Sequence, residues 1–136
     1  MTPVLTPDQR AFLAGHQWAV LATTRQDGSP QQSLIGYTVD HAGRIVLSTK
    51  SYTAKWHNAL RQPDVSLTVV DGRAHLVVYG VAEAIDHDPD RAELSADVFR
   101  RLFGGPRPDP SSLVASLDEQ QRTILRIKPR KALFLD

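Results

Sequence analysis

The sequence predicts an antiparallel β-barrel decorated by helices, and three observations indicate this class. Short apolar or alternating runs recur along the chain, separated by turn signals such as Asp27-Gly28 and Asp71-Gly72. Three such runs follow one another directly after the first helix, whereas a parallel α/β sheet would alternate strand and helix strictly. The 136 residues suffice for one core, so we expect a single domain over residues 1–136.

The first part of the chain predicts a helix followed by consecutive strands. Thr6 is a favourable N-cap, Pro7 suits the first helical position and Gln9 completes a capping box, while Gly15 ends the helix. The run that begins at Trp18 is apolar and too short for a helix, so it predicts a buried strand with Trp18 in the core. The strands expected here span residues 18–24, 31–40 and 44–49.

The rest of the chain predicts helices alternating with strands. Ser51 or Thr53 can cap a helix that Pro63 stops, and Gly80 predicts a bulge inside a long strand. Asp88 and Pro89 suit the N-cap and first turn of another helix. The expected helices end near residues 61, 103 and 121, and the expected strands span 65–70, 75–85 and 123–128, the last with an extension over 132–135 after a kink at Pro129.

Composition excludes several classes of protein. The absence of cysteine excludes a disulfide framework, thiol catalysis and cysteine-ligated zinc, and it fits a cytoplasmic protein. The five histidines have no metal-ligand spacing, so we expect no metal. A net charge of +1 gives no field that favours nucleic acid, and no apolar run approaches the roughly 20 residues of a membrane span. Redox chemistry in such a chain would require an organic cofactor.

Residues 49–61 hold the best candidate for an anion site. A helix N-terminus presents free N–H groups and a partial positive charge, so with hydroxyls and a lysine beside it, it attracts a phosphate. The alternative is an amphipathic helix with a basic outer face, and the spacing alone leaves both interpretations open. The candidate residues are Thr49, Lys50 and Ser51 at the end of a strand, and Lys55, Asn58 and Arg61 on the next helix.

Motifs in a particular order resemble the split-barrel flavin and deazaflavin oxidoreductases, the pyridoxamine-phosphate-oxidase-like superfamily, and most closely its branch that uses coenzyme F420. The resemblance covers nearly the whole chain. Ser51 departs from a common basic residue, Ala59 from a leucine and Gln31 from a histidine. The residues that carry it are Phe12-Leu13, Trp18-Ala19-Val20-Leu21-Ala22-Thr23, Asp27-Gly28-Ser29-Pro30, Ser33, Thr49, Lys55, Asn58, Pro63, Val65, Gly80-Val81-Ala82-Glu83 and Ile127-Lys128-Pro129.

The resemblance implies a six-stranded antiparallel split β-barrel that forms a homodimer, with two cofactor sites at the subunit interface. The segment at residues 49–61 would hold the cofactor phosphate, and Gln32 and Ser33 would lie along the cofactor ring. The resemblance implies no obligate catalytic side chain. Solvent or a tyrosine would supply the proton, although core packing is the default expectation for Tyr37 and Tyr79.

Three functions therefore stand as hypotheses. The first is an F420-dependent reductase that transfers a hydride from the reduced deazaflavin to an unsaturated small molecule. The second keeps the fold but binds FMN, as an oxidase or reductase. The third is a non-catalytic protein that binds a flavin or a tetrapyrrole. Quinones, enones and biliverdin-like tetrapyrroles all remain open as substrates.

Overall fold

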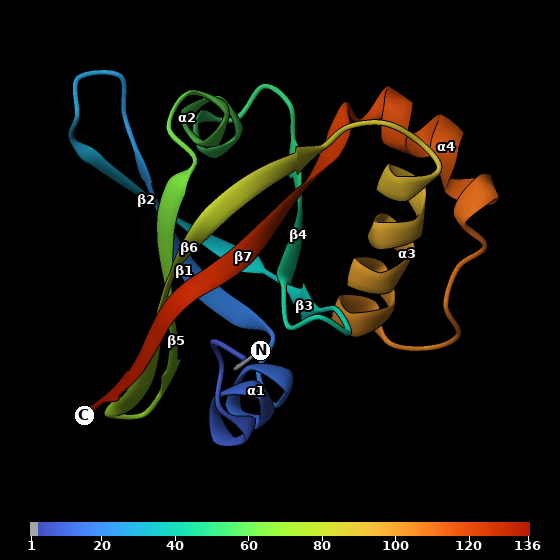
Figure 1. The fold of residues 1–136 in the computed structure, drawn as a ribbon. Coiled ribbons are helices and arrows are strands. Elements are labelled where there is room, and N and C mark those ends of the chain that lie inside the picture. The colour runs from blue at the N-terminus through green and yellow to red at the C-terminus, as the bar shows by residue number, and fades with distance from the viewer. Residues whose placement is uncertain (1–2) are drawn as a thin grey trace.

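The computed structural model describes residues 3–136, which form one seven-stranded antiparallel sheet and four helices. The strands lie side by side in the order β2-β1-β5-β6-β7-β4-β3. Because only Tyr37 separates β2 from β3, one bent strand supplies both outer strands, and the sheet curls into a half-barrel (Figure 1). The strands are β1 (Trp18–Thr24), β2 (Pro30–Gly36), β3 (Thr38–Val39), β4 (Ile45–Lys50), β5 (Asp64–Asp71), β6 (Ala74–Ile85) and β7 (Arg122–Leu135).

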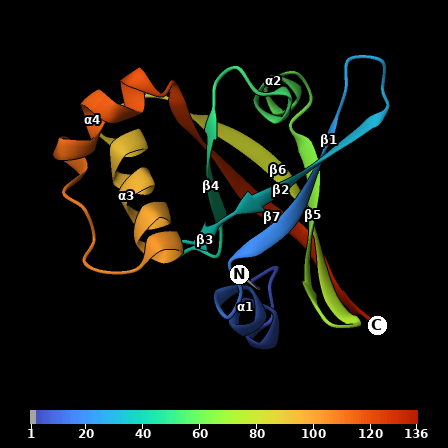
Figure 2. The same cartoon turned by 180° about the vertical axis from the view of Figure 1, so that it is seen from behind.

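The helices close the two ends and one side of the curled sheet. Figures 1 and 2 show α1 (Pro7–Ala14) at one end and α2 (Ala54–Arg61) at the opposite end. A pair formed by α3 (Asp90–Phe103) and α4 (Pro110–Glu119) lies beside β4. In α1 the predicted capping box is present: the Gln9 amide N–H donates to the Thr6 hydroxyl, and the Gln9 side chain accepts from the Thr6 amide. No helix within residues 3–136 is long and apolar enough to cross a membrane.

The main core fills the inside of the half-barrel. Leu21, Leu47, Leu67 and Ile127 are almost completely buried there, as strand alternation requires. A smaller cluster of Val46, Val98 and Ile124 lies beneath α3. Val46 and Leu47 of β4, like Ile124 and Leu125 of β7, are therefore buried on opposite faces of the sheet, which explains the apolar run at the start of β4.

The second expected strand, over residues 31–40, is divided in the structure. The Tyr37 side chain is fully buried and its hydroxyl donates to the carbonyl of Leu13 in α1 at 2.6 Å. The Tyr37 amide donates to the carbonyl of Gln17, so the backbone leaves the sheet ladder at this residue. The division gives seven strands where six were expected. The default expectation of core packing for Tyr37 is confirmed.

The prediction that Trp18 lies in the core is wrong, because its side chain is 56% exposed. Alternation along β1 directs Ala19, Leu21 and Thr23 inward, which leaves Trp18 on the outer face of the sheet. There it faces Gly36, its partner on β2. The default expectation for Tyr79 is wrong for the same reason, since its side chain is 48% exposed on the outer face of β6. Runs of apolar residues show that a strand is buried but not which face is inside.

Smaller differences concern the prolines. The helix expected after Asp88 has Pro89 as its N-cap, although the Asp88 carboxylate still accepts from the amide of Ala92 at 3.1 Å. Pro110 begins α4, since a proline fits the first helical position. Pro129 does not divide β7, which continues to Leu135. The predicted bulge is confirmed: the register of β6 against β7 shifts between Tyr79 and Gly80.

Candidate cofactor site

The inner face of the half-barrel changes from apolar to polar near α2. On β1, Leu21 is followed on the same face by Thr23, and on β4, Leu47 is followed by Thr49. On β2, Ile35 is preceded on the same face by Ser33 and Gln31. We call Thr23, Gln31, Ser33 and Asn58 the polar cluster; Asn58 joins it from α2. Hydroxyls and amides thus replace aliphatic side chains on the inner face at this end of the barrel, and they offer hydrogen bonds.

Hydrogen bonds hold the polar cluster in one arrangement. The Asn58 Nδ2 donates to Thr23 Oγ1 at 3.1 Å, and that hydroxyl donates to Gln31 Oε1 at 3.0 Å. The Gln31 Nε2 in turn donates to Ser33 Oγ at 2.9 Å. The side chains of Thr23 and Asn58 are buried, whereas those of Gln31 and Ser33 are half-buried. The chain of bonds thus runs from the interior toward a partly open surface on β2.

The first turn of α2 presents amides that no side chain caps. Thr53 is the N-cap, but its hydroxyl donates to the carbonyl of Lys50 at 2.9 Å and lies 3.0 Å from the Thr49 hydroxyl. The first N–H groups of a helix have no intrahelical acceptor. With Thr53 engaged elsewhere, these N–H groups are available to a ligand. A phosphate is the ligand class best suited to them.

Lys55 lies in this first turn of α2, as the sequence predicted. Its side chain is half-buried, and burial lowers the pKa of its amine below the ordinary value. Within residues 3–136, no carboxylate lies close enough to form an ion pair with it. A half-buried lysine without a counter-charge is costly for the folded protein, because desolvation of its charge is not repaid. An anion bound at this position would offset the desolvation cost of the Lys55 charge.

Lys50 and Ser51 both lie near Arg122 of β7, a residue distant in the sequence. Lys50 lies directly opposite Arg122 of β7, and no carboxylate among the described residues pairs with either. The Arg122 guanidinium donates only to neutral oxygens, to Gln120 Oε1 at 2.8 Å and to Ser48 Oγ at 3.5 Å. Ser51 lines a hollow of about 310 Å³ that Arg122 also lines. Asp86, Asp118 and Arg91 line the same hollow, so Ser51 shares it with charges of both signs.

Arg61, Gln32 and Ser33 are the remaining candidates, and their side chains have different surroundings. The Arg61 Nη2 donates to Asn58 Oδ1 at 2.8 Å and to the carbonyl of Thr24 at 3.0 Å, so Arg61 ties α2 to β1. Gln32 and Ser33 are neighbours on β2 and therefore point to opposite faces. Ser33 belongs to the polar cluster, whereas Gln32 is exposed on the outer face. The structure thus brings together Ser33, Asn58 and Arg61, with Lys55 on the same short helix.

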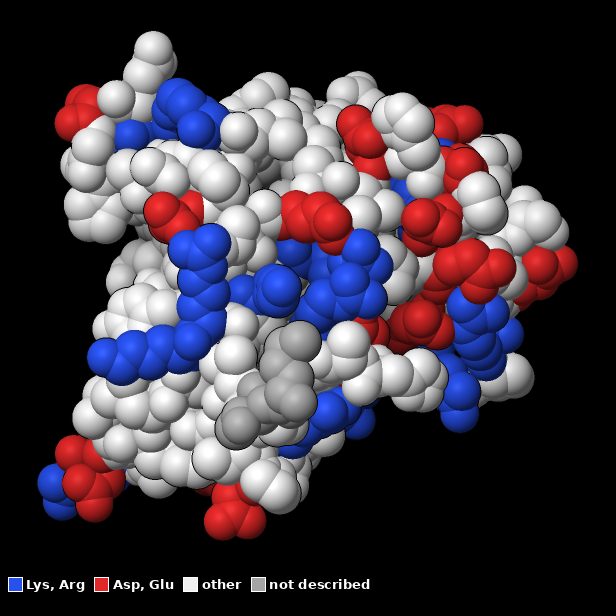
Figure 3. Space-filling view, in the orientation of Figure 1, with Lys and Arg blue, Asp and Glu red and all other residues white. Residues whose placement is uncertain are grey.

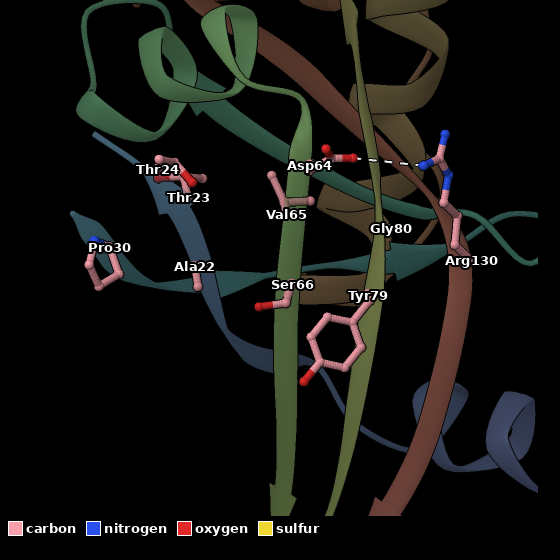
Figure 4. A pocket seen from close by; sticks show the side chains of 10 residues that line it. All are labelled: Ala22, Thr23, Thr24, Pro30, Asp64, Val65, Ser66, Tyr79, Gly80 and Arg130. Carbon is pink, nitrogen blue, oxygen red and sulfur yellow. Dashed lines mark ion pairs between the residues drawn. The ribbon is translucent and has the colours of Figure 1, made fainter. Parts of the chain in front are cut away.

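A second hollow, a groove of about 430 Å³, lies on the outer face of the sheet. Figure 4 shows Ser66 of β5 and Tyr79 of β6 side by side in this groove, with Pro30 of β2 at its far edge. At its other end Asp64 faces Arg130 of β7, at 3.8 Å. Thr23 of the polar cluster also lines the groove, so the groove and the polar cluster are adjacent. The outer face thus carries a polar groove beside exposed apolar side chains.

The tyrosines differ in their ability to move a proton. Burial raises the pKa of Tyr37 to about 12, and its hydroxyl is bound to a carbonyl, so it is locked in a structural role. Tyr79 is half-exposed in the outer groove, where a ligand can reach its hydroxyl. On the helix that carries Lys55, Trp56 is buried and His57 is exposed.

Sequence reasoning missed Arg122, Thr23 and Gln31 as parts of the site. Arg122 comes from a strand more than 70 residues after Lys50, and only the register of β4 against β7 places them together. Thr23 gave a weak signal, since a hydroxyl at an inward position interrupts the apolar face of β1. Gln31 was noted only as a departure from a common histidine, although it links Thr23 to Ser33.

Comparison with known proteins points to one family. The sequence profile described as Pyridoxamine 5'-phosphate oxidase matches residues 5–136. Among solved structures, a conserved hypothetical protein from Mycobacterium tuberculosis is 25% identical with a TM-score of 0.82, over 100% of this chain and 88% of that one. An F420 reductase is 24% identical with a TM-score of 0.73, over 95% and 98% of the two chains. The heme storage protein HutZ from Vibrio cholerae is 18% identical with a TM-score of 0.72, over 96% and 93%. The last two likenesses establish the fold alone.

Proposed function

The chain belongs to the pyridoxamine 5'-phosphate oxidase family, and from this premise we propose that it is an F420-dependent reductase. The phosphate of the cofactor would lie at the first turn of α2, and its ring would extend toward the polar cluster. The observation that carries the proposal is Lys55, a half-buried amine without a counter-charge beside uncapped helix amides. An F420 reductase with the same fold shows that such a barrel is compatible with this activity.

The residues of the site have distinct tasks in this proposal. Lys55 and the uncapped amides of α2 bind the phosphate, and Thr49 and Ser51 lie beside them on the preceding strand and turn. Ser33 and Gln31 offer hydrogen bonds to the edge of the ring. Bound reduced F420 supplies a hydride to an unsaturated small molecule. The protein then contributes orientation and exclusion of water, and the proton comes from solvent or from Tyr79.

Lys50 and Arg122 favour F420 over FMN. Like charges placed directly opposite each other on neighbouring strands repel and destabilise the pair. F420 carries a lactyl and oligoglutamate tail beyond its phosphate, whereas FMN ends at the phosphate. An anionic tail that reaches Lys50 and Arg122 would relieve their repulsion. FMN would gain nothing there, so the two cofactors should differ in affinity.

Fluorescence titration of the purified protein with F420 and with FMN tests the proposal. We expect F420 to bind more tightly, and its affinity to fall more steeply as salt rises, because exposed charge contacts are screened. Arg122→Gln should reduce the affinity for F420 several-fold and leave the affinity for FMN unchanged. Tighter binding of FMN would instead support an FMN-dependent oxidoreductase of the same fold. Binding of F420 without any oxidation of its reduced form by quinones or enones would support a non-catalytic carrier.

A further inference from the structure

A crevice of about 450 Å³ lies between α1, the turn before β4, and β7, and it shares no lining residue with the groove or the polar cluster. Val4, Leu5 and Pro129 supply its apolar surface. Its volume lies within the range of roughly 300–1,000 Å³ typical of small-molecule sites. Figure 3 shows that Lys and Arg side chains gather on this face of the molecule. The crevice is thus both apolar inside and positively charged around it.

The three cations that line the crevice are Arg10, Arg44 and Lys128. Among these three, only Arg44 has a carboxylate partner within the described part of the chain: its Nε donates to Asp40 Oδ2 at 2.8 Å. The Arg10 Nη2 donates to the carbonyl of His41 at 2.9 Å, a neutral acceptor that fixes the guanidinium without cancelling its charge. Lys128 forms no ion pair within residues 3–136 and is exposed. Two positive charges therefore face the crevice without compensation.

Gly43 lies between these cations and the apolar surface. It adopts a φ of +79°, which favours glycine, and it is buried in the turn before β4. A Cβ placed on it would lie 3.7 Å from both Arg10 Cζ and Leu5 Cδ1. The turn therefore brings its bare backbone to the point where the charged and apolar parts of the crevice meet.

We propose that this crevice binds a small amphiphilic carboxylate. Its carboxylate would pair with Arg10 and Lys128, since charge-assisted hydrogen bonds to a carboxylate are the strongest that these side chains make. Its apolar body would cover Val4, Leu5 and Pro129. An inorganic anion uses only the first feature and a neutral apolar molecule only the second. The site therefore selects a molecule that has both.

Calorimetric titration with decanoate tests this site, with decanol and inorganic phosphate as comparisons. Decanoate should bind at least roughly tenfold more tightly than either, as one charge-assisted hydrogen bond implies. The double variant Arg10→Gln/Lys128→Gln should lose roughly tenfold or more of that affinity. Lys131→Gln is the matched control, because Lys131 is an exposed lysine of the same strand that does not line the crevice. Amide chemical shifts should change first at Leu5, Ala42 and Gly43.

Three results would overturn the proposal. Equal affinities for decanoate and decanol would remove the role of the cations. Unchanged binding by the double variant, or shift changes confined to α2 and the polar cluster, would place the ligand elsewhere. Sedimentation with vesicles of anionic phosphatidylglycerol, lost in the double variant while free decanoate does not bind, would identify a membrane surface as the ligand. If the wild-type protein does not bind F420, the test of the crevice remains valid, because the two sites share no residue.

Discussion

Lys55 is the side chain on which the proposed cofactor binding depends most directly. Its replacement by alanine should weaken both F420 and FMN by roughly ten- to hundredfold, the value of a charged hydrogen bond to phosphate. The variant should still fold, because burial of the Lys55 amine lowers the stability of the folded protein when no ligand is bound. Fluorescence titration gives the affinity and thermal melting gives the stability. The control is His57→Ala, which alters an exposed neighbour on the same helix. Unchanged affinity for both cofactors would contradict the phosphate assignment.

The lowered pKa of Lys55 also predicts how binding depends on pH. Above that pKa the amine is neutral, so the phosphate loses a charged partner and affinity falls as the pH rises. The fall should begin at a lower pH than for an ordinary lysine, whose pKa is about 10.4. Lys55→Arg should remove the alkaline loss, because a guanidinium stays charged throughout this range. Titrations from neutral to alkaline pH check this, with circular dichroism to monitor the fold. Parallel pH profiles for the two proteins would show that another group titrates.

Among the secondary-structure elements, the bulge between β6 and β7 is the most sensitive to change. A Cβ on Gly80 would lie 2.6 Å from the backbone oxygen of Lys128, which cannot move without distorting β7. Gly80→Ala should therefore reduce the free energy of unfolding by about 1–3 kcal/mol. At Gly36, the closest atoms are the methyl groups of Leu102, at 2.7 and 2.8 Å, and a flexible side chain can shift. Gly36→Ala should cost clearly less. Urea unfolding of both variants measures the difference, and equal losses would show that β7 relaxes freely.

The outer face of the sheet carries several large apolar side chains that are exposed in the protomer. Trp18, Leu34, Val70 and Tyr79 are 56%, 70%, 56% and 48% exposed on this face. Large exposed apolar patches usually mark an interaction surface. The resemblance implied a homodimer, and a second copy of the chain is the partner we propose for this face. The inward-facing residues Leu67 and Val69 of β5, by contrast, lie in the protomer's own core.

We predict that the chain sediments at micromolar concentration with twice its mass of 15.1 kDa. A stable interface of this kind buries roughly 2,000 Å² or more. Leu34→Arg should convert the dimer to a monomer. It should also weaken cofactor binding, because the outer groove lies next to the polar cluster. Ala115→Arg is the control, since Ala115 is exposed on α4, a helix that contacts α3 and β7. A wild-type protein that sediments only as a monomer would contradict the prediction.

Local signals were sufficient for most elements. The capping box at Thr6 and Gln9, the turn glycines and the bulge at Gly80 are each decided within a few residues of sequence, so they could be predicted. The strand–helix segment around Lys55 could also be identified, because helix-terminus chemistry is local. Division of a strand at Tyr37 could not be predicted. It depends on a hydrogen bond to Leu13 of α1, 24 residues away.

Tertiary structure decided the direction of each strand face and the partners across strands. The apolar residues of β1 alternate weakly, so only the assembled barrel shows that Ala19 is inside and Trp18 outside. Strand register sets Arg122 against Lys50, and the packing of α1 beside the turn before β4 gathers Arg10, Arg44 and Lys128 around one crevice. Charges from distant segments meet only after the chain has folded, and no local spacing encodes their distance. Propensity and capping act over a few residues and were readable in the sequence; a site built from several strands was not.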